Sequence, residues 1–199
     1  MQFDSPQRGF SYLAEGPLDM RFDPSKPLTA DEIVNLWTEA ELAELIYRFG
    51  EERAARRIAR AIVRARPVKG TRELAAIVSK ASPRHGSHPP ATQTFQALRI
   101  AVNSELEAVE TTLPQAAKAL DRHGRMAVIT FHSLEDRLVK EYYRRESRDC
   151  ICPPEQPVCT CGHHAILKEI TRRPIRPTDR EIEQNSRARS AKLRVAEKL

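Results

Sequence analysis

The feature that most constrains the fold is a largely apolar run that ends abruptly in polar and ionisable side chains. The run covers residues 126–131 and is followed by His132, Ser133, Glu135 and Asp136. Consecutive apolar residues predict a strand buried on both faces, as in a parallel sheet covered by helices. Ligands of such α/β sheets lie beyond the carboxyl ends of the strands. The run therefore predicts an α/β fold with candidate functional residues just after the strand.

A purely structural role for the same residues is an alternative. Ser133 and Asp136 have the spacing of a helix capping box, in which each side chain bonds to the backbone amide of the other residue. His132 lies at the end of the strand, which favours a function for it. The sequence leaves both interpretations open.

Three regions are predicted along the chain. Residues 1–28 contain scattered prolines and glycines, which indicate irregular backbone. Residues 29–90 have the periodicity of a compact all-helical unit. Residues 91–199 combine further helices, the strand described above and a cysteine-rich loop at 149–164. The division predicts a helical unit between two parts of a different fold.

Local signals place several of the helix and strand ends. Thr29 with Glu32 and Thr38 with Glu41 fit capping boxes, and Gly50 sits where a helix would stop. A long apolar stripe predicts a helix from about residue 92 to residue 113, after which a proline at 114 opens a further helix. Near the end of the chain, Ala191, Leu193 and Val195 alternate with Lys192, Arg194 and Ala196. This alternation predicts a closing strand whose lysine and arginine face water.

The glycines are informative because of where they do not occur. A nucleotide-handling α/β domain normally begins with a strand, a glycine-rich turn and a helix. No two of the seven glycines are close enough to form Gly-x-Gly. Two or three strands are also too few for an independent sheet of this kind. We therefore expect the first half of the sheet to be missing from the amino end.

A stripe of arginines is the clearest charge pattern in a chain with a formal net charge of +6. Such a balance favours a polyanionic partner. The stripe consists of Arg53, Arg57, Arg60 and Arg64. This spacing places the guanidinium groups on one side of a helix, where they suit phosphates. The alternative is a solvated face whose arginines pair with nearby glutamates.

All the cysteines lie in one short segment. They form two Cys-x-Cys pairs, Cys150 with Cys152 and Cys159 with Cys161. Four thiolates match the tetrahedral demand of a structural zinc ion, although the usual spacing is Cys-x-x-Cys. A neighbouring histidine at 163 or 164 would relieve this constraint by replacing one cysteine. Free thiols and redox pairing are the other interpretations.

Targeting signals are not found in the sequence. No stretch has the length and hydropathy of a membrane span, and the first residues lack the basic and then apolar pattern of a signal peptide. We therefore expect a cytoplasmic location, no membrane partner and reduced thiols.

Six blocks of sequence together carry a family resemblance. They are residues 2–4 with 8–11, 16–23, 47–53, 92–106, 131–137 and 187–194. In this order they resemble the bacterial ribosomal RNA small-subunit methyltransferase H family, also called MraW. The resemblance implies a class I (Rossmann-like) methyltransferase sheet that is interrupted by an inserted helical domain.

The resemblance also implies a reaction. Members of the family transfer a methyl group from S-adenosylmethionine to the exocyclic N4 of a cytidine in the decoding region of small-subunit ribosomal RNA. They begin with a glycine-rich cofactor loop that this sequence does not contain, so we expect an N-terminally truncated form. Of the family's cofactor contacts, only Gln2 has a counterpart here.

Methylation of an amino group needs a positioned acceptor for its proton. The acceptors that we predict are Asp19, His132 and Glu135, with Ser133 and Asn103 as orienting groups. The target base must leave its stack, and the RNA backbone must be held. Further phosphate contacts are predicted at Arg172, Arg173, Arg176, Arg187 and Arg189. The alternative function is a non-catalytic, zinc-stapled RNA-binding remnant of such an enzyme, and the sequence predicts no oligomeric state.

Overall fold

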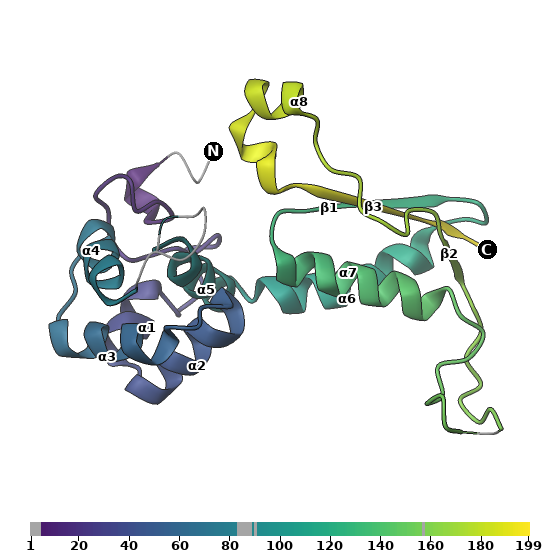
Figure 1. Ribbon diagram of the computed structural model, residues 1–199, viewed down its shortest axis with the longest axis horizontal. Coiled ribbons are helices and arrows are strands. Elements are labelled where there is room, and N and C mark those ends of the chain that lie inside the picture. Colours follow the sequence, from purple (N-terminus) through teal and green to yellow (C-terminus); the bar gives the residue numbers. More distant parts are fainter. Residues whose placement is uncertain (1–4, 83–88, 90, 157) are drawn as a thin grey trace. The chain divides into compact units, whose positions relative to one another are not determined.

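The computed structural model describes residues 5–82, 89, 91–156 and 158–199. The chain forms two compact units, Met1–Glu105 and Leu106–Leu199, and each is described by itself. In Figure 1 the first unit runs from purple to teal and the second from green to yellow. Within the described ranges no helix is long and apolar enough to cross a membrane.

The first unit is built from helices. They are η2 (Pro6–Arg8), α1 (Ala30–Leu36), α2 (Glu39–Gly50), α3 (Ala55–Ala65), α4 (Thr71–Ala81) and α5 (Ala91–Asn103). Both predicted capping boxes are confirmed. Thr29 Oγ1 accepts a hydrogen bond from the Glu32 amide (3.2 Å), and the Glu32 carboxylate accepts one from the Thr29 amide (3.0 Å). Thr38 and Glu41 form the same arrangement at the start of α2.

The core of the first unit joins its helices to the irregular segment that precedes α1. Ile33, Ile58 and Leu98 are at most 1% exposed. Leu18 and Met20, from the irregular segment, belong to the same core. Irregular backbone is confirmed there on either side of η2, but the segment is packed. The three-part division of the chain stays a prediction, because this compact unit includes the irregular segment and α5.

The second unit packs two long helices against one face of a small sheet (Figure 1). Its strands follow the order β1-β3-β2, and both neighbouring pairs are antiparallel. In the register Met126 pairs with Ala196, and Lys168 pairs with Glu197. The elements are α6 (Glu105–Ala119), β1 (Arg125–Thr130), α7 (Ser133–Glu146), β2 (Leu167–Glu169), α8 (Asp179–Gln184), η3 (Ser186–Ser190) and β3 (Lys192–Lys198).

The strand after residue 124 is confirmed, and so is the α/β class, but the expected burial on both faces is wrong for the residues that the structure describes. Burial alternates along β1: Met126 and Thr130 are buried, whereas Ile129 is 59% exposed. Buried residues of α6 and α7, among them Leu113 and Tyr143, form one core cluster with Met126. Only one face of the sheet is therefore covered by these helices.

The closing strand is confirmed as β3, but its faces are reversed. Arg194 is 3% exposed and Ala196 is fully buried, while Leu193 and Val195 are half-buried. The face that was expected to be wet is the covered one. The physical reason is a carboxylate on α7. Arg194 Nε lies 2.7 Å from Asp136 Oδ1, so the buried guanidinium has a negatively charged partner on the covered face of the sheet.

The prediction that a helix begins at Pro114 is wrong, because Pro114 lies inside α6. The break comes earlier, between α5 and α6. Ser104 separates these helices with a φ of 52°, which lies in the left-handed region. A residue in this conformation ends a right-handed helix.

Candidate functional site

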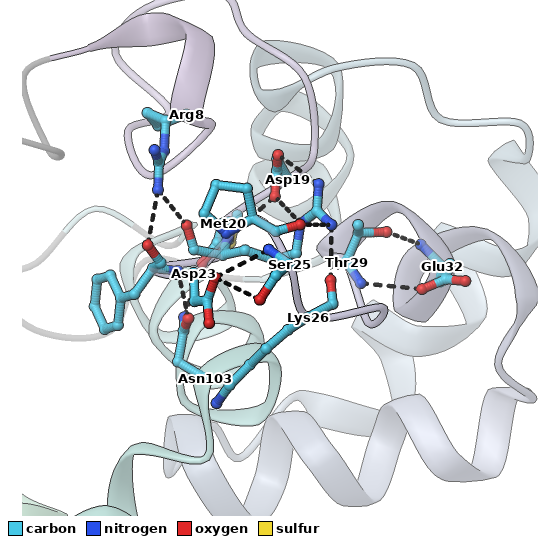
Figure 2. Close-up of polar contacts among 12 residues, drawn as sticks. Arg8, Asp19, Met20, Asp23, Ser25, Lys26, Thr29, Glu32 and Asn103 are labelled. Atoms are coloured by element: carbon cyan, nitrogen blue, oxygen red, sulfur yellow. Dashed lines mark hydrogen bonds and ion pairs between the residues drawn. The ribbon is translucent and has the colours of Figure 1, made fainter.

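Asn103, at the end of α5, holds the backbone of residues 20–22 (Figure 2). Its Oδ1 accepts a hydrogen bond from the Phe22 amide (2.6 Å). Its Nδ2 donates to the carbonyl oxygens of Met20 (2.7 Å) and Arg99 (2.9 Å). Asn103 is 8% exposed. These contacts use both ends of the amide on backbone groups, so in the first unit Asn103 orients a loop.

Asp19 lies in the same loop and is paired with Arg21 (Figure 2). Arg21 donates from Nε to Asp19 Oδ1 (2.7 Å) and from Nη2 to Oδ2 (3.2 Å). The hydrogen bond from Arg21 lowers the pKa of Asp19 below its ordinary value. Arg21 also donates to the carbonyl oxygens of Pro24 and Lys26. Asp19 is therefore a weak proton acceptor that fixes the Arg21 side chain.

A second arginine and a glycine complete this loop. Arg8 Nη2 donates to the carbonyl oxygens of Arg21 (2.6 Å) and Phe22 (3.1 Å). Gly9 has a φ of 69°, and a Cβ at this position would collide with the carbonyl oxygen of Pro17. The segment thus folds back on itself closely enough for Arg8 to reach residues 21 and 22.

His132 and Glu135, in the second unit, form the capping box of α7. The Glu135 amide donates to His132 Nδ1 (3.3 Å), and Glu135 Oε2 accepts from the amides of Phe131 (2.8 Å) and His132 (3.3 Å). The predicted box of Ser133 and Asp136 is therefore wrong, because the helix begins one residue earlier than that pairing requires. The imidazole performs the capping that was expected of the serine hydroxyl.

The capping geometry also assigns the proton of the imidazole. Because Nδ1 accepts a hydrogen bond, the proton of neutral His132 lies on Nε2, which is 3.3 Å from Glu135 Oε1. Burial alone would raise the pKa of Glu135, but hydrogen bonds from His132 and the Phe131 amide outweigh it and lower the pKa. The pair is thus a carboxylate and a fixed imidazole at the end of β1. Beside it, Phe131 is 52% exposed.

Asp136 joins α7 to β3 by an ion cluster that the sequence analysis missed. Its carboxylate accepts two hydrogen bonds from Arg194 (2.7 and 3.3 Å) and one from Lys192 Nζ (3.2 Å). Burial would raise the pKa of Asp136, but these hydrogen bonds and positive charges outweigh it and lower the pKa. The partners lie far apart in the sequence, so no local spacing indicated them.

Three of the four arginines of the predicted stripe line a groove, and the fourth does not. Arg57, Arg60 and Arg64 line an open groove of 580 Å³ between α3 and α4, together with Lys80. Arg53 is exposed but does not line this groove. Arg60 pairs with Glu39 (3.2 Å) at an exposed position. Lys80 was missed by the sequence analysis, because its place beside the stripe follows from the packing of two helices.

Two sets of predicted binding residues remain: five carboxyl-terminal arginines for RNA and Gln2 for the cofactor. The carboxyl-terminal arginines are exposed, three between β2 and α8 and two on η3: Arg172, Arg173, Arg176, Arg187 and Arg189. Gln2 lies outside the described residues.

The predicted catalytic residues are divided between the two units. Asp19 and Asn103 belong to the first unit, whereas His132, Ser133 and Glu135 belong to the second. A single site that contains all of these residues stays a prediction.

The four cysteines come together on the loop between α7 and β2. Their Sγ atoms all lie within 4.8 Å of one another. His163 is not part of this group, since its Nε2 lies 3.1 Å from the carbonyl oxygen of Arg145. Four cysteine sulfurs therefore come together without a histidine in place of one of them.

Comparisons with known proteins extend over the whole chain. The family model described as the MraW methylase family matches residues 1–199. A protein of Thermomicrobium roseum is 54% identical over 202 residues, which cover 100% of this chain and 62% of the relative. Proteins of Dehalococcoides mccartyi and Brevibacillus brevis are 53% and 52% identical, with 100% of this chain and 57% and 65% of the relatives covered.

Each of these relatives is named ribosomal RNA small subunit methyltransferase H. The chain spans about three fifths of the length of the relatives that it matches. Because the family model matches from the first residue to the last, the chain belongs to the MraW methylase family.

Proposed function

We propose that the chain is part of an enzyme that methylates small-subunit ribosomal RNA at the exocyclic N4 of a cytidine in the decoding region, with S-adenosylmethionine as the methyl donor. The observation that carries this proposal is the match of the family model to all of residues 1–199. The names of relatives that are 52 to 54% identical support the substrate class.

The described residues do not fit the methyl donor by themselves. A nucleoside cofactor needs a glycine-rich turn at the end of a strand, and the described glycines stand singly, away from such turns. We therefore assign the donor pocket to the part of the relatives that lies outside the match. No donor contact is assigned to the described residues.

The sheet of the second unit supports a larger fold of the Rossmann-like type. Its uncovered face carries Ile129, Leu193 and Val195, and Ile129 is 59% exposed. Within the described ranges β1 pairs only with β3, so its other edge is open to a further strand. Exposed apolar surface on a sheet favours a covering layer. We propose that the unmatched part of the relatives supplies further strands and helices there.

We assign the removal of the amino proton to Glu135, with His132 as its positioning residue. The new N–C bond makes the amino nitrogen cationic and strongly acidic, so an acceptor of lowered pKa is sufficient. Glu135 is a carboxylate of lowered pKa, and His132 lies against it: Nδ1 accepts from the Glu135 amide, and Nε2 lies 3.3 Å from Oε1. The exposed ring of Phe131 beside the pair offers a stacking surface to an everted base.

The assignment is tested in a chimera whose unmatched segment, taken from the Thermomicrobium roseum relative, precedes residue 1. With labelled S-adenosylmethionine and small-subunit RNA, we expect Glu135→Gln to lower kcat by about 10²-fold or more and to leave KM for RNA unchanged. Glutamine retains the capping geometry, so the helix should still form. Glu141→Gln, on an exposed position of α7, is the matched control. An equal kcat in both variants would remove Glu135 from the reaction.

A non-catalytic RNA-binding role is the second candidate. It is favoured by the isolated glycines, none of which forms a glycine-rich turn for a cofactor. Transfer of labelled methyl groups from S-adenosylmethionine to small-subunit RNA by the chimera separates the two functions. Methylated RNA supports the enzyme, whereas RNA binding by the 199-residue chain without methylation by the chimera supports a non-catalytic role.

A further inference from the structure

We infer that Cys150, Cys152, Cys159 and Cys161 bind one structural zinc ion. Their Sγ atoms form a compact group: Cys152 lies 3.9 Å from Cys159, Cys159 lies 3.6 Å from Cys161, and Cys161 lies 3.9 Å from Cys150. In a tetrahedral site with Zn–S bonds of about 2.3 Å, neighbouring sulfurs are about 3.8 Å apart. The spacing of the thiols is that of the ligands of a single ion.

Disulfide bonds and iron–sulfur clusters do not fit the distances between these sulfurs. A disulfide needs sulfurs at about 2.05 Å, and all four cysteines are free. An iron–sulfur cluster with several iron atoms would hold the Sγ atoms of its cysteines farther apart. Here all four Sγ atoms lie within 4.8 Å of one another. Tetrahedral coordination by four thiolates without redox chemistry is the preference of zinc.

Backbone amides also point to negatively charged sulfur. The Ile151 amide donates to Cys161 Sγ (3.5 Å), and the Cys152 amide donates to Cys150 Sγ (3.4 Å). The first hydrogen bond joins the two Cys-x-Cys segments, and the second lies within one of them. Amide donors stabilise the thiolate form, in which cysteine binds a metal.

The described part of the loop has no core of its own. From residue 148 to residue 162, none of the described residues is buried, and none is in a helix or strand. Figure 1 shows this loop extending away from the helices and sheet of the second unit. A short segment without a core needs a metal or a covalent link to be ordered. Four exposed or half-exposed thiols would not gather without such a reason.

The stem of the loop is tied to the fold by ordinary hydrogen bonds, so the ion has a defined task. The Ile166 amide donates to the carbonyl oxygen of Glu146 (2.9 Å), and the Ala165 amide donates to Asp149 Oδ1 (3.2 Å). These contacts join α7 to the segment before β2. The zinc ion would fix the part of the loop beyond them, and its binding does not depend on methyl transfer.

The experiment measures metal content and coordination in the full chain, purified under reducing conditions from zinc-containing medium. We expect one zinc ion per chain, which is released when an organomercurial modifies four thiols. Replacement of zinc by Co²⁺ should give the visible absorption of tetrahedral thiolate coordination. Limited proteolysis should cut the loop rapidly after the metal is removed and slowly before.

Two variants test the ligand set. Cys161→Ser should lose the zinc ion and the cobalt spectrum, whereas His163→Gln in the same loop should retain both. The cobalt spectrum of the unaltered chain decides the proposal even if the serine variant does not fold. A chain without zinc whose four thiols react freely, two disulfides, iron in place of zinc, or full zinc binding by Cys161→Ser would each overturn the inference.

Discussion

Replacing Asp136 by alanine is expected to destabilise the second unit by about 3–5 kcal/mol, because it leaves a buried arginine without its counter-charge. Arg194 is 3% exposed, and Asp136 accepts two of its hydrogen bonds. Lys192, which shares the carboxylate, would add a like charge nearby. A loss of this size removes a large part of the stability of a small domain.

Hydrogen–deuterium exchange of the β3 amides measures this effect, with about 10²- to 10⁴-fold faster exchange expected in the variant. Arg125→Gln is the matched control: Arg125 pairs with Glu197 across β1 and β3, but its side chain is 68% exposed. We expect a change below about 1 kcal/mol there. Trp37 lies in the first unit, so its fluorescence should stay unchanged. Exchange as slow as in the unaltered chain would contradict the role of the ion cluster.

The same cluster predicts a dependence on pH. The pKa of Asp136 is lowered in the folded chain, so its contribution to stability is present above the unfolded pKa and is lost as the pH falls through the folded one. The loss should therefore begin below about pH 4. The alanine variant should lack this part of the acid response in β3 exchange.

Removal of the arginines in the α3–α4 groove is expected to weaken RNA binding more than an equal loss of charge beside it. Arg57, Arg64 and Lys80 are exposed and line one groove, where a phosphate can contact several cations at once. For Arg57→Gln combined with Arg64→Gln, we expect about a tenfold or greater loss of affinity. The slope of log affinity against log salt should decrease by about 1.5, because two phosphate contacts are lost.

The matched control for the groove is Arg53→Gln combined with Arg56→Gln. Both residues are exposed near the start of α3 and lie outside the groove, and the net charge falls by the same amount. We expect less than about a threefold loss of affinity, measured by fluorescence anisotropy with a small-subunit RNA fragment. Equal losses in the two double variants would mean that only overall charge attracts the RNA.

Local sequence signals predicted much of the fold because their partners are close along the chain. Thr29 with Glu32 and Thr38 with Glu41 are separated by one helical turn, so the capping boxes could be identified directly. The position of β3 followed from a local alternation of the same kind. The chemistry of a cap is settled within a few residues.

What the sequence could not provide are the contacts between distant elements. The buried face of β3 depends on Asp136, which lies 58 residues before Arg194. The groove depends on Lys80, which belongs to a different helix from the arginine stripe. His132 took the capping role from Ser133 because the helix started one residue earlier. For β3 and for the groove, contacts between distant elements decided the outcome, whereas the cap of α7 was decided locally by which of two adjacent residues begins the helix.

The most direct test of the proposed reaction is nucleoside mass spectrometry of small-subunit RNA after incubation with the chimera and S-adenosylmethionine. We expect N4-methylcytidine at one position in the decoding region, and its loss in the Glu135→Gln variant. Methylation at a carbon of the ring, methylation of another base, or an unmodified RNA with a folded, donor-binding chimera would contradict the proposed reaction.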